Sequence, residues 1–80
     1  ESILSRLVVV EMGAVIKSSV VLDGVIVEPN ASVQRAIVDK DVVIEAGASV
    51  GWNRENDLAR GCTVSESGVT VVPKGAVIKP

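Results

Sequence analysis

Aliphatic residues recur along the first fifty positions of the chain with a period of 17 residues. When the chain is superposed on itself at this spacing, nine aligned positions are all aliphatic, and eight of them are followed four residues later by a second apolar residue. The first set comprises Leu4, Val21, Val38, Val10, Val27, Ile44, Ile16, Val33 and Val50, and the second comprises Val8, Val25, Val42, Ala14, Ala31, Ala48, Val20 and Ile37. Mostly polar residues lie between them. Both sets are predicted to point inward.

Each 17-residue unit divides into two six-residue blocks and one five-residue block, which predicts three short strands and three corners per unit. Gly13, Asn30 and Gly47 occupy one equivalent corner position, and these residue types tolerate positive φ best. Hexapeptide periodicity with three blocks per turn indicates a parallel β-helix with a continuous aliphatic column. We therefore predict an all-β fold, a single-stranded left-handed parallel β-helix of three coils with a C-terminal cap. The left hand is taken from the resemblance of the blocks to known hexapeptide-repeat proteins.

The repeat stops after Val50, which divides one domain into coils over residues 1–50 and a cap over residues 51–80. Residues 53–60 are expected to form one or two helical turns, with Asn53 as N-cap and Gly61 at the C-terminal stop. Residues 62–72 are expected to form a strand or loose hairpin. Trp52 lies where the column ends, so its ring is predicted to cover the last coil, with a substrate-stacking role as the alternative.

An apolar stripe is predicted on the outside of the coils, where Val9, Ile26 and Val43 occupy the same outward position in successive units. It reflects either ordinary β-propensity at a corner or a contact with the tail, another domain or a second subunit, and we expect burial. A second outward column consists of three glutamates that are also 17 residues apart, namely Glu11, Glu28 and Glu45. A solvated corner is favoured over a metal site there, because hard cations need several converging oxygens.

Composition narrows the functional classes. The 80 residues carry a net charge of −2, which argues against a nucleic-acid surface, and aromatic residues make up 1%, which suits a narrow interior. One cysteine permits no internal disulfide, and no membrane-length apolar run or signal peptide is visible, so we expect a soluble cytoplasmic protein. The chain begins with Glu1 and its pattern begins mid-coil, because Ile3 aligns with Val20 and Ile37. We therefore expect a piece of a longer protein.

Catalysis by this chain alone is not expected. Hexapeptide-repeat acyltransferases use a histidine general base, and gamma-class carbonic anhydrases hold zinc with three histidines, whereas this sequence contains no histidine. No cysteine cluster exists, no Ser or Cys has an identifiable base partner, and no glycine-rich phosphate loop follows a strand. The sequence therefore predicts no catalytic residue, no metal ligand and no cofactor within these residues.

Three segments in fixed order carry a more specific resemblance. They are VQRAIVDKDVVIEAGASVG at 33–51, RENDLARG at 54–61 and SGVTVVPKG at 67–75. Together they resemble the C-terminal end of the ADP-glucose pyrophosphorylase family, also called glucose-1-phosphate adenylyltransferase. The resemblance covers nearly the whole chain.

The resemblance implies a function for the longer protein. Members of this family make ADP-glucose from ATP and glucose 1-phosphate for glycogen or starch synthesis. An N-terminal nucleotidyltransferase domain carries catalysis and would use magnesium with ATP, and a left-handed β-helix follows it. That β-helix is regulatory, packs on the catalytic domain, takes part in a homotetramer and helps to form a cleft for phosphorylated metabolite effectors.

Two basic residues match family positions that contact the activator. Lys40 in VDKD aligns with the basic residue of the family's I-D-(K/R) motif, and Lys74 in VVPK aligns with the basic residue after the final strand. The resemblance thus implies an effector-binding role for both, whereas the alternative is that they are solvated surface lysines. Arg35 and Arg60 are further candidates without a motif match. Two other functions stay open: an acyltransferase with its site between subunits, and a purely structural β-helix module.

Overall fold

The computed structural model describes residues 2–5 and 7–80, which form short strands and one helix. The strands before residue 51 are β1 (Ile3–Leu4), β2 (Val9–Val10), β3 (Val15–Lys17), β4 (Val20–Val21), β5 (Ile26–Val27), β6 (Ser32–Gln34), β7 (Ala36–Val38), β8 (Val43–Ile44) and β9 (Ser49–Val50). The later elements are α1 (Arg54–Ala59), β10 (Thr63–Val64), β11 (Thr70–Val72) and β12 (Val77–Ile78).

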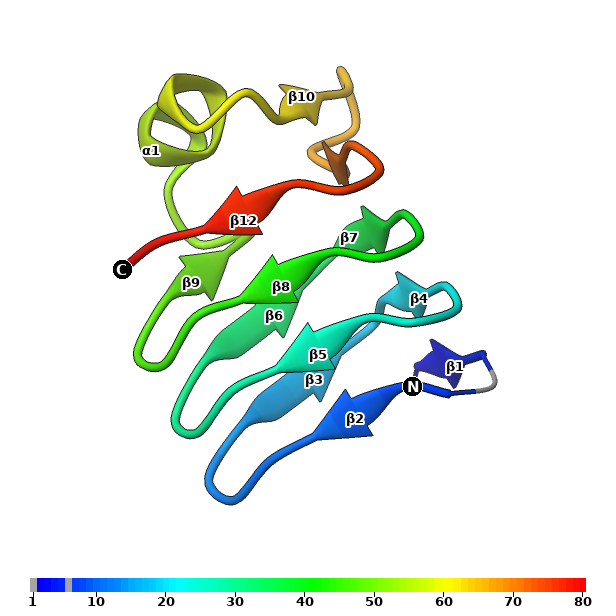
Figure 1. Cartoon of the computed structure of the whole chain (residues 1–80). Coiled ribbons are helices and arrows are strands. Elements are labelled where there is room, and N and C mark those ends of the chain that lie inside the picture. The colour runs from blue at the N-terminus through cyan, green and yellow to red at the C-terminus, as the bar shows by residue number, and fades with distance from the viewer. Residues whose placement is uncertain (1, 6) are drawn as a thin grey trace.

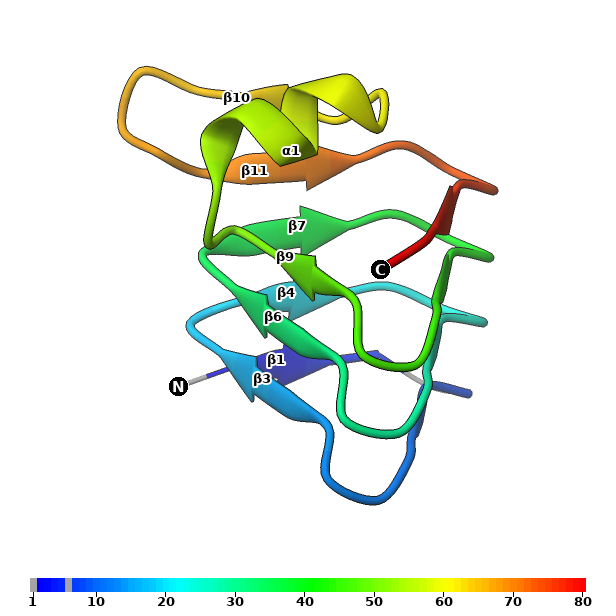
Figure 2. The same ribbon diagram turned by 90° about the vertical axis from the view of Figure 1, so that its left-hand side faces the viewer.

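The strands form the three faces of a prism (Figures 1 and 2). Sheet A has the order β1-β4-β7-β11-β10, sheet B the order β2-β5-β8-β12 and sheet C the order β3-β6-β9. All strand pairs are parallel except β10 with β11, which is antiparallel. Each successive strand belongs to the next face, so the chain winds as a parallel β-helix, as predicted. The left hand of the winding stays a prediction.

The 17-residue repeat sets the register of the parallel strands, because paired residues in successive coils are 17 positions apart. Val10 pairs with Val27 and Val27 with Ile44, one repeat apart. Val38 instead pairs with Val72, two repeat lengths away, because α1 and β10 lie in between. Strands β11 and β12 therefore stack on β7 and β8 as the beginning of a fourth coil. Residues 51–80, expected as a cap, combine two parts. Residues 51–69, which contain α1 and β10, form an insert, and β11 and β12 extend the stack.

The aliphatic column lies inside the prism. Its fully or nearly buried apolar members are Val21, Val25, Val27, Ala31, Val33, Ala36, Val38, Val42, Ile44, Ala48, Val50, Cys62, Val72 and Ile78. Four predicted inward residues do not join it. Leu4 and Val10 of the first coil are 48% and 41% exposed, Val20 is half-buried and Ile37 is 40% exposed. At Val20 and Ile37 the strand begins directly after the corner, and because strand side chains alternate, the preceding Ser19 and Ala36 point inward instead.

Each described corner contains one residue with positive φ, as the sequence predicted for Gly13, Asn30 and Gly47. The other corners use Leu7, Gly24, Asp41 and Gly75 between sheets A and B, and Ser18 and Arg35 between sheets C and A. A Cβ at position 13 would also meet the Asn30 side chain, which would have to shift to accommodate it. Glycine and asparagine identify only some of these corners, since stacking imposes the same φ on other residue types.

The insert covers the end of the stack (Figure 2). Helix α1 lies within the range 53–60 expected from the sequence, and the Asn53 side chain accepts a hydrogen bond from the Asn56 amide at 3.1 Å. Trp52 is 51% exposed, so it is not buried in the column, and coverage of the last coil by its ring stays a prediction. The insert instead buries its own Asp57 and Cys62, and the Thr70 hydroxyl of β11 bonds to Asp57. The described part of the chain contains no helix long and apolar enough to cross a membrane.

Candidate functional site at a corner of the prism

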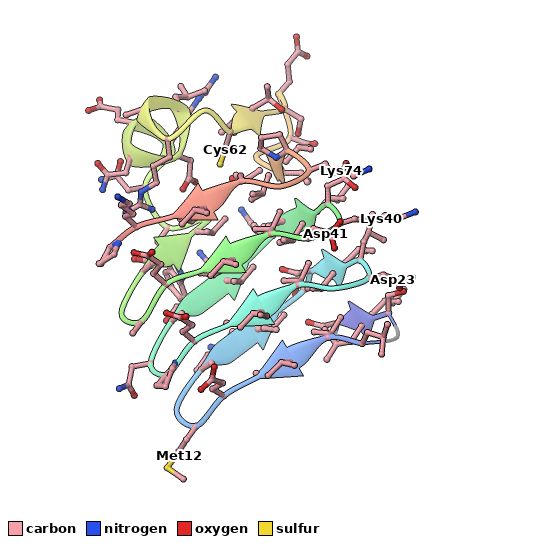
Figure 3. All side chains as sticks on the ribbon, in the orientation of Figure 1. Met12, Asp23, Lys40, Asp41, Cys62 and Lys74 are labelled. Carbon is pink, nitrogen blue, oxygen red and sulfur yellow. The ribbon has the colours of Figure 1, made fainter. Side chains whose placement is uncertain are left out.

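Lys40 and Lys74 lie at the same corner of the prism on adjacent coils. Lys40 follows β7 and Lys74 follows β11, and the Gly75 amide donates a hydrogen bond to the Lys40 carbonyl at 3.0 Å. Both side chains are exposed and project from the corner between sheets A and B (Figure 3). The structure therefore brings together two lysines that are separated by two repeat lengths in the sequence.

The corner backbone is fixed by local interactions. The Asp39 carboxylate accepts a hydrogen bond from the Lys40 amide at 2.7 Å. Pro73, directly before Lys74, has a restricted φ, and Gly75 adopts a φ of 76°. The Asp41 amide in turn bonds to the Asp23 carbonyl of the coil below at 3.0 Å. These contacts give both lysines a defined place while their ammonium groups stay in solvent.

The charges at this corner are mixed. Asp23 and Asp41 lie beside Lys40 on the same edge (Figure 3), and Asp39 directly precedes it. Asp23 also accepts a hydrogen bond from the Ser5 hydroxyl. Two ammonium groups attract a phosphate dianion, but three nearby carboxylates oppose it. An anion site at this corner therefore needs further donors from outside these residues.

Neither candidate arginine joins the two lysines. Arg35 lies at a different corner, between β6 and β7, where its φ is 47°. Arg60 lies at the insert, where its Nη1 donates to the Ser49 carbonyl at 2.6 Å. Arg60 thus donates to a backbone carbonyl of the edge strand β9, away from the two lysines. Among the residues that the structure describes, the candidate site consists of these two corner lysines.

One member of the glutamate ladder links two coils through its side chain. Glu28 is half-buried, and its Oε1 accepts a hydrogen bond from the Ala46 amide of the next coil at 3.1 Å. Glu28 therefore links two coils from a half-buried position, and the preference for a solvated corner over a metal site stays a prediction. Within residues 2–5 and 7–80, no group of three or more His, Cys, Asp or Glu side chains is placed to hold a metal ion.

The apolar stripe continues into the tail. Val77 pairs with Val43 and adds a further residue to the column of Val9, Ile26 and Val43. Val9 and Val77 are 49% and 52% exposed. The tail therefore lengthens the stripe and does not cover it. The hypothesis that the tail buries the stripe is wrong. Contact with another domain or subunit stays a prediction.

A buried polar cluster, which sequence reasoning missed, lies between the insert and the end of the stack. Asp57 is 1% exposed, and its Oδ2 accepts hydrogen bonds from the Gly51 amide at 3.0 Å and the Thr70 hydroxyl at 3.1 Å. Burial and, secondarily, Asp57 raise the pKa of the adjacent Cys62 thiol, whereas Arg60 opposes them. The polarity of the residues in α1 does not indicate which of them is buried, because the charged Asp57 is buried whereas the apolar Leu58 beside it is 49% exposed.

Comparisons with known proteins cover nearly the whole chain. Residues 1–72 match the model of the family described as GlmU-like, C-terminal hexapeptide. The chain is 46% identical over 77 residues to the glucose-1-phosphate adenylyltransferase of Bifidobacterium adolescentis and 48% identical over 77 residues to that of Deinococcus radiodurans. Each alignment covers 96% of this chain and 19% of the relative. The chain thus spans about a fifth of the length of these curated relatives.

Proposed function

Because this chain belongs to the GlmU-like, C-terminal hexapeptide family, we propose from its adenylyltransferase relatives that it is a regulatory and oligomerisation domain of a glucose-1-phosphate adenylyltransferase. The longer protein would make ADP-glucose from ATP and glucose 1-phosphate. This domain would pack on the catalytic domain and bind a phosphorylated metabolite that controls it.

The observation that carries the regulatory proposal is the shared corner of Lys40 and Lys74. The backbone bond between Gly75 and Lys40 holds the two turns together, so both ammonium groups reach the same region of solvent. Lysine acts as a compact point charge, and two such charges suit a phosphate that carries about two negative charges. The effector class is therefore a small phosphorylated sugar or acid.

The carboxylates at the corner imply that the effector site is shared. Asp23, Asp39 and Asp41 weaken the attraction that two lysines exert on an anion. Further cations from the catalytic domain or from a second subunit would complete the site. An effector held between this corner and another domain favours one relative placement of the two, which is the basis of allosteric control.

Catalysis and the magnesium that accompanies ATP are proposed to belong to the rest of the longer protein. The sequence offers no histidine for acyl transfer, and the described residues offer no converging metal ligands. Residues of this chain would contribute position and charge to regulation. No step of the reaction is assigned to them.

The test is substitution of the two lysines in the full-length enzyme. Lys40→Gln and Lys74→Gln should each raise the concentration of fructose 1,6-bisphosphate or 3-phosphoglycerate needed for half-maximal activation by about tenfold or more, because each removes a charge-assisted contact. Basal ADP-glucose synthesis without effector should be unchanged. Lys17→Gln is the matched control, since Lys17 is an exposed lysine on sheet C.

Unchanged activation in the doubly substituted enzyme would remove the effector role of this corner. Absence of ADP-glucose synthesis by the full-length parent would remove the enzyme assignment itself. In that case an acyl-transfer assay with acetyl-coenzyme A would test the remaining enzymatic alternative. A purely structural module would show neither activity nor effector dependence.

A further inference from the structure

One carboxylate of the insert bonds to the stack at both ends of the interruption, in addition to the bond from Arg60 to the Ser49 carbonyl and the pairing of β10 with β11. Asp57 lies in α1, and its Oδ2 accepts hydrogen bonds from the Gly51 amide and the Thr70 hydroxyl. Gly51 directly follows β9, whereas Thr70 is the first residue of β11. A single oxygen therefore joins the residues at which the chain leaves and re-enters the stack.

The bond to Thr70 lies on the strand that ends at the corner carrying Lys74. The Thr70 amide donates to the Arg35 carbonyl at 2.9 Å, and Thr70 to Val72 pair in register with Ala36 to Val38. Pro73 and Lys74 follow immediately. The other neighbour of β11 is β10, which belongs to the insert itself. Strand β11, and with it Lys74, therefore lies between β7 on one side and the insert on the other, so closure of the insert contributes to its placement.

The carboxylate is incompletely satisfied. Asp57 Oδ1 is buried and has no hydrogen-bond partner among the residues that the structure describes. An unpartnered buried polar atom reduces the stability of the arrangement that buries it. The closed insert thus combines two hydrogen bonds that favour closure with one buried oxygen that opposes it.

We propose that Asp57 is a positioning residue that couples closure of the α1 insert to the placement of the Lys74 corner. Opening of the insert releases the start of β11 and lets the Lys74 turn move away from Lys40. An anion held by both lysines favours the closed insert, and by linkage the closed insert favours the anion. This effector consequence rests on the proposed function, whereas the positioning role of Asp57 does not.

Cys62 provides a native reporter of closure. It is the sole cysteine of the sequence, it is 4% exposed, and its amide donates to the Asp57 carbonyl at 3.1 Å. In the full-length protein, any cysteines outside this segment are replaced first. Labelling of Cys62 by a thiol reagent should be about tenfold faster or more in Asp57→Ala, because two hydrogen bonds to a carboxylate are lost. Asp57→Asn, which keeps an acceptor oxygen, should label at an intermediate rate.

Hydrogen exchange reports on the corner itself. Asp57→Ala should speed amide exchange over residues 73–78, which include the Gly75 amide bonded to Lys40, while Ile26–Val27 exchange at the parent rate. Thr70→Val, which removes one hydroxyl without a charge, should act in the same direction, and Thr70→Ser should not. Glu55→Ala is the control, since Glu55 is an exposed carboxylate of the same helix.

Unchanged exchange over residues 73–78 in both Asp57→Ala and Thr70→Val would overturn the positioning role. If Asp57→Ala unfolds the domain, Ile26–Val27 also lose protection, and Thr70→Val then decides alone. Fructose 1,6-bisphosphate should slow Cys62 labelling in the parent protein and not in the Lys40→Gln, Lys74→Gln double variant. If it has no effect while Asp57→Ala opens the insert, the effector assignment fails and the positioning role stands.

Discussion

At the scale of single residues, Gly51 is the most constrained glycine of the chain. It has a φ of 86°, and a Cβ there would overlap the backbone carbonyl of Gln34 in the coil below. Its carbonyl also accepts a hydrogen bond from Gln34 Nε2 at 3.1 Å. The close approach of two backbones, in addition to the turn, therefore requires glycine at this position.

Gly51→Ala is expected to lower the free energy of unfolding by about 3 kcal/mol or more, because both left-handed strain and a backbone overlap oppose it. Gly47→Ala is the matched control. Gly47 has a φ of 77°, but no atom lies within 4 Å of the position that an added Cβ would occupy, so strain alone should cost about 1 kcal/mol. Urea unfolding of the two variants measures the difference. Equal losses would show that the Gln34 contact is irrelevant.

Cys62 should make the stability of the domain depend on pH in the alkaline range. Its thiol pKa is raised above the ordinary value of 9.0, mainly by burial, so the unfolded chain loses this proton first. The contribution of the buried thiol is therefore complete below about pH 9 and is lost as the pH rises toward the folded-state pKa. The difference in unfolding free energy between the parent and Cys62→Ala should narrow between about pH 7 and about pH 10. A constant difference would contradict this.

At the scale of elements, the first coil exposes strand edges and apolar side chains together. Strands β1, β2 and β3 each lie at the edge of a sheet. Leu4 and Val10, which belong to the inward set, are 48% and 41% exposed, whereas their equivalents Val21 and Val27 are fully buried. Unpaired edges with apolar residues promote association. This end of the stack is therefore suited to covering by another coil or chain.

The 80-residue chain in isolation is expected to self-associate through this end. Val9→Lys places a charge on edge strand β2 and should shift the chain toward monomer. Ser49→Lys is the control, because Ser49 is exposed on strand β9 at the opposite end of sheet C. Light scattering across a concentration series measures the distribution. A sharp monomer of the parent chain at high concentration would count against self-association.

At the scale of the whole molecule, the three faces of the prism differ in outward polarity. Sheet A carries the column Ile3, Val20, Ile37 and Val71, and sheet B carries Val9, Ile26, Val43 and Val77. Sheet C presents Ser32, Gln34 and Ser49 on its two later strands. The corner with Lys40 and Lys74 lies between the two apolar faces. A partner that covered either apolar face would therefore reach the candidate effector site.

The sequence by itself determined the coil, because a repeat of inward aliphatic residues has few other ways to bury them. It located the start of α1 through Asn53 and one set of corners through Gly13, Asn30 and Gly47. These features depend on residues near one another in the chain or on an unbroken period. Resemblance, not periodicity, selected Lys40 and Lys74.

Tertiary structure alone decided which residues come together from the two sides of the insert. The period breaks after Val50, so nothing local indicates that β11 returns to β7 two repeats later and places Lys74 above Lys40. The same return buries Asp57 against Thr70 and leaves Trp52 half-exposed. Asp57 can be buried because Gly51 and Thr70 donate hydrogen bonds to it. The hydropathy of the sequence does not predict these partners.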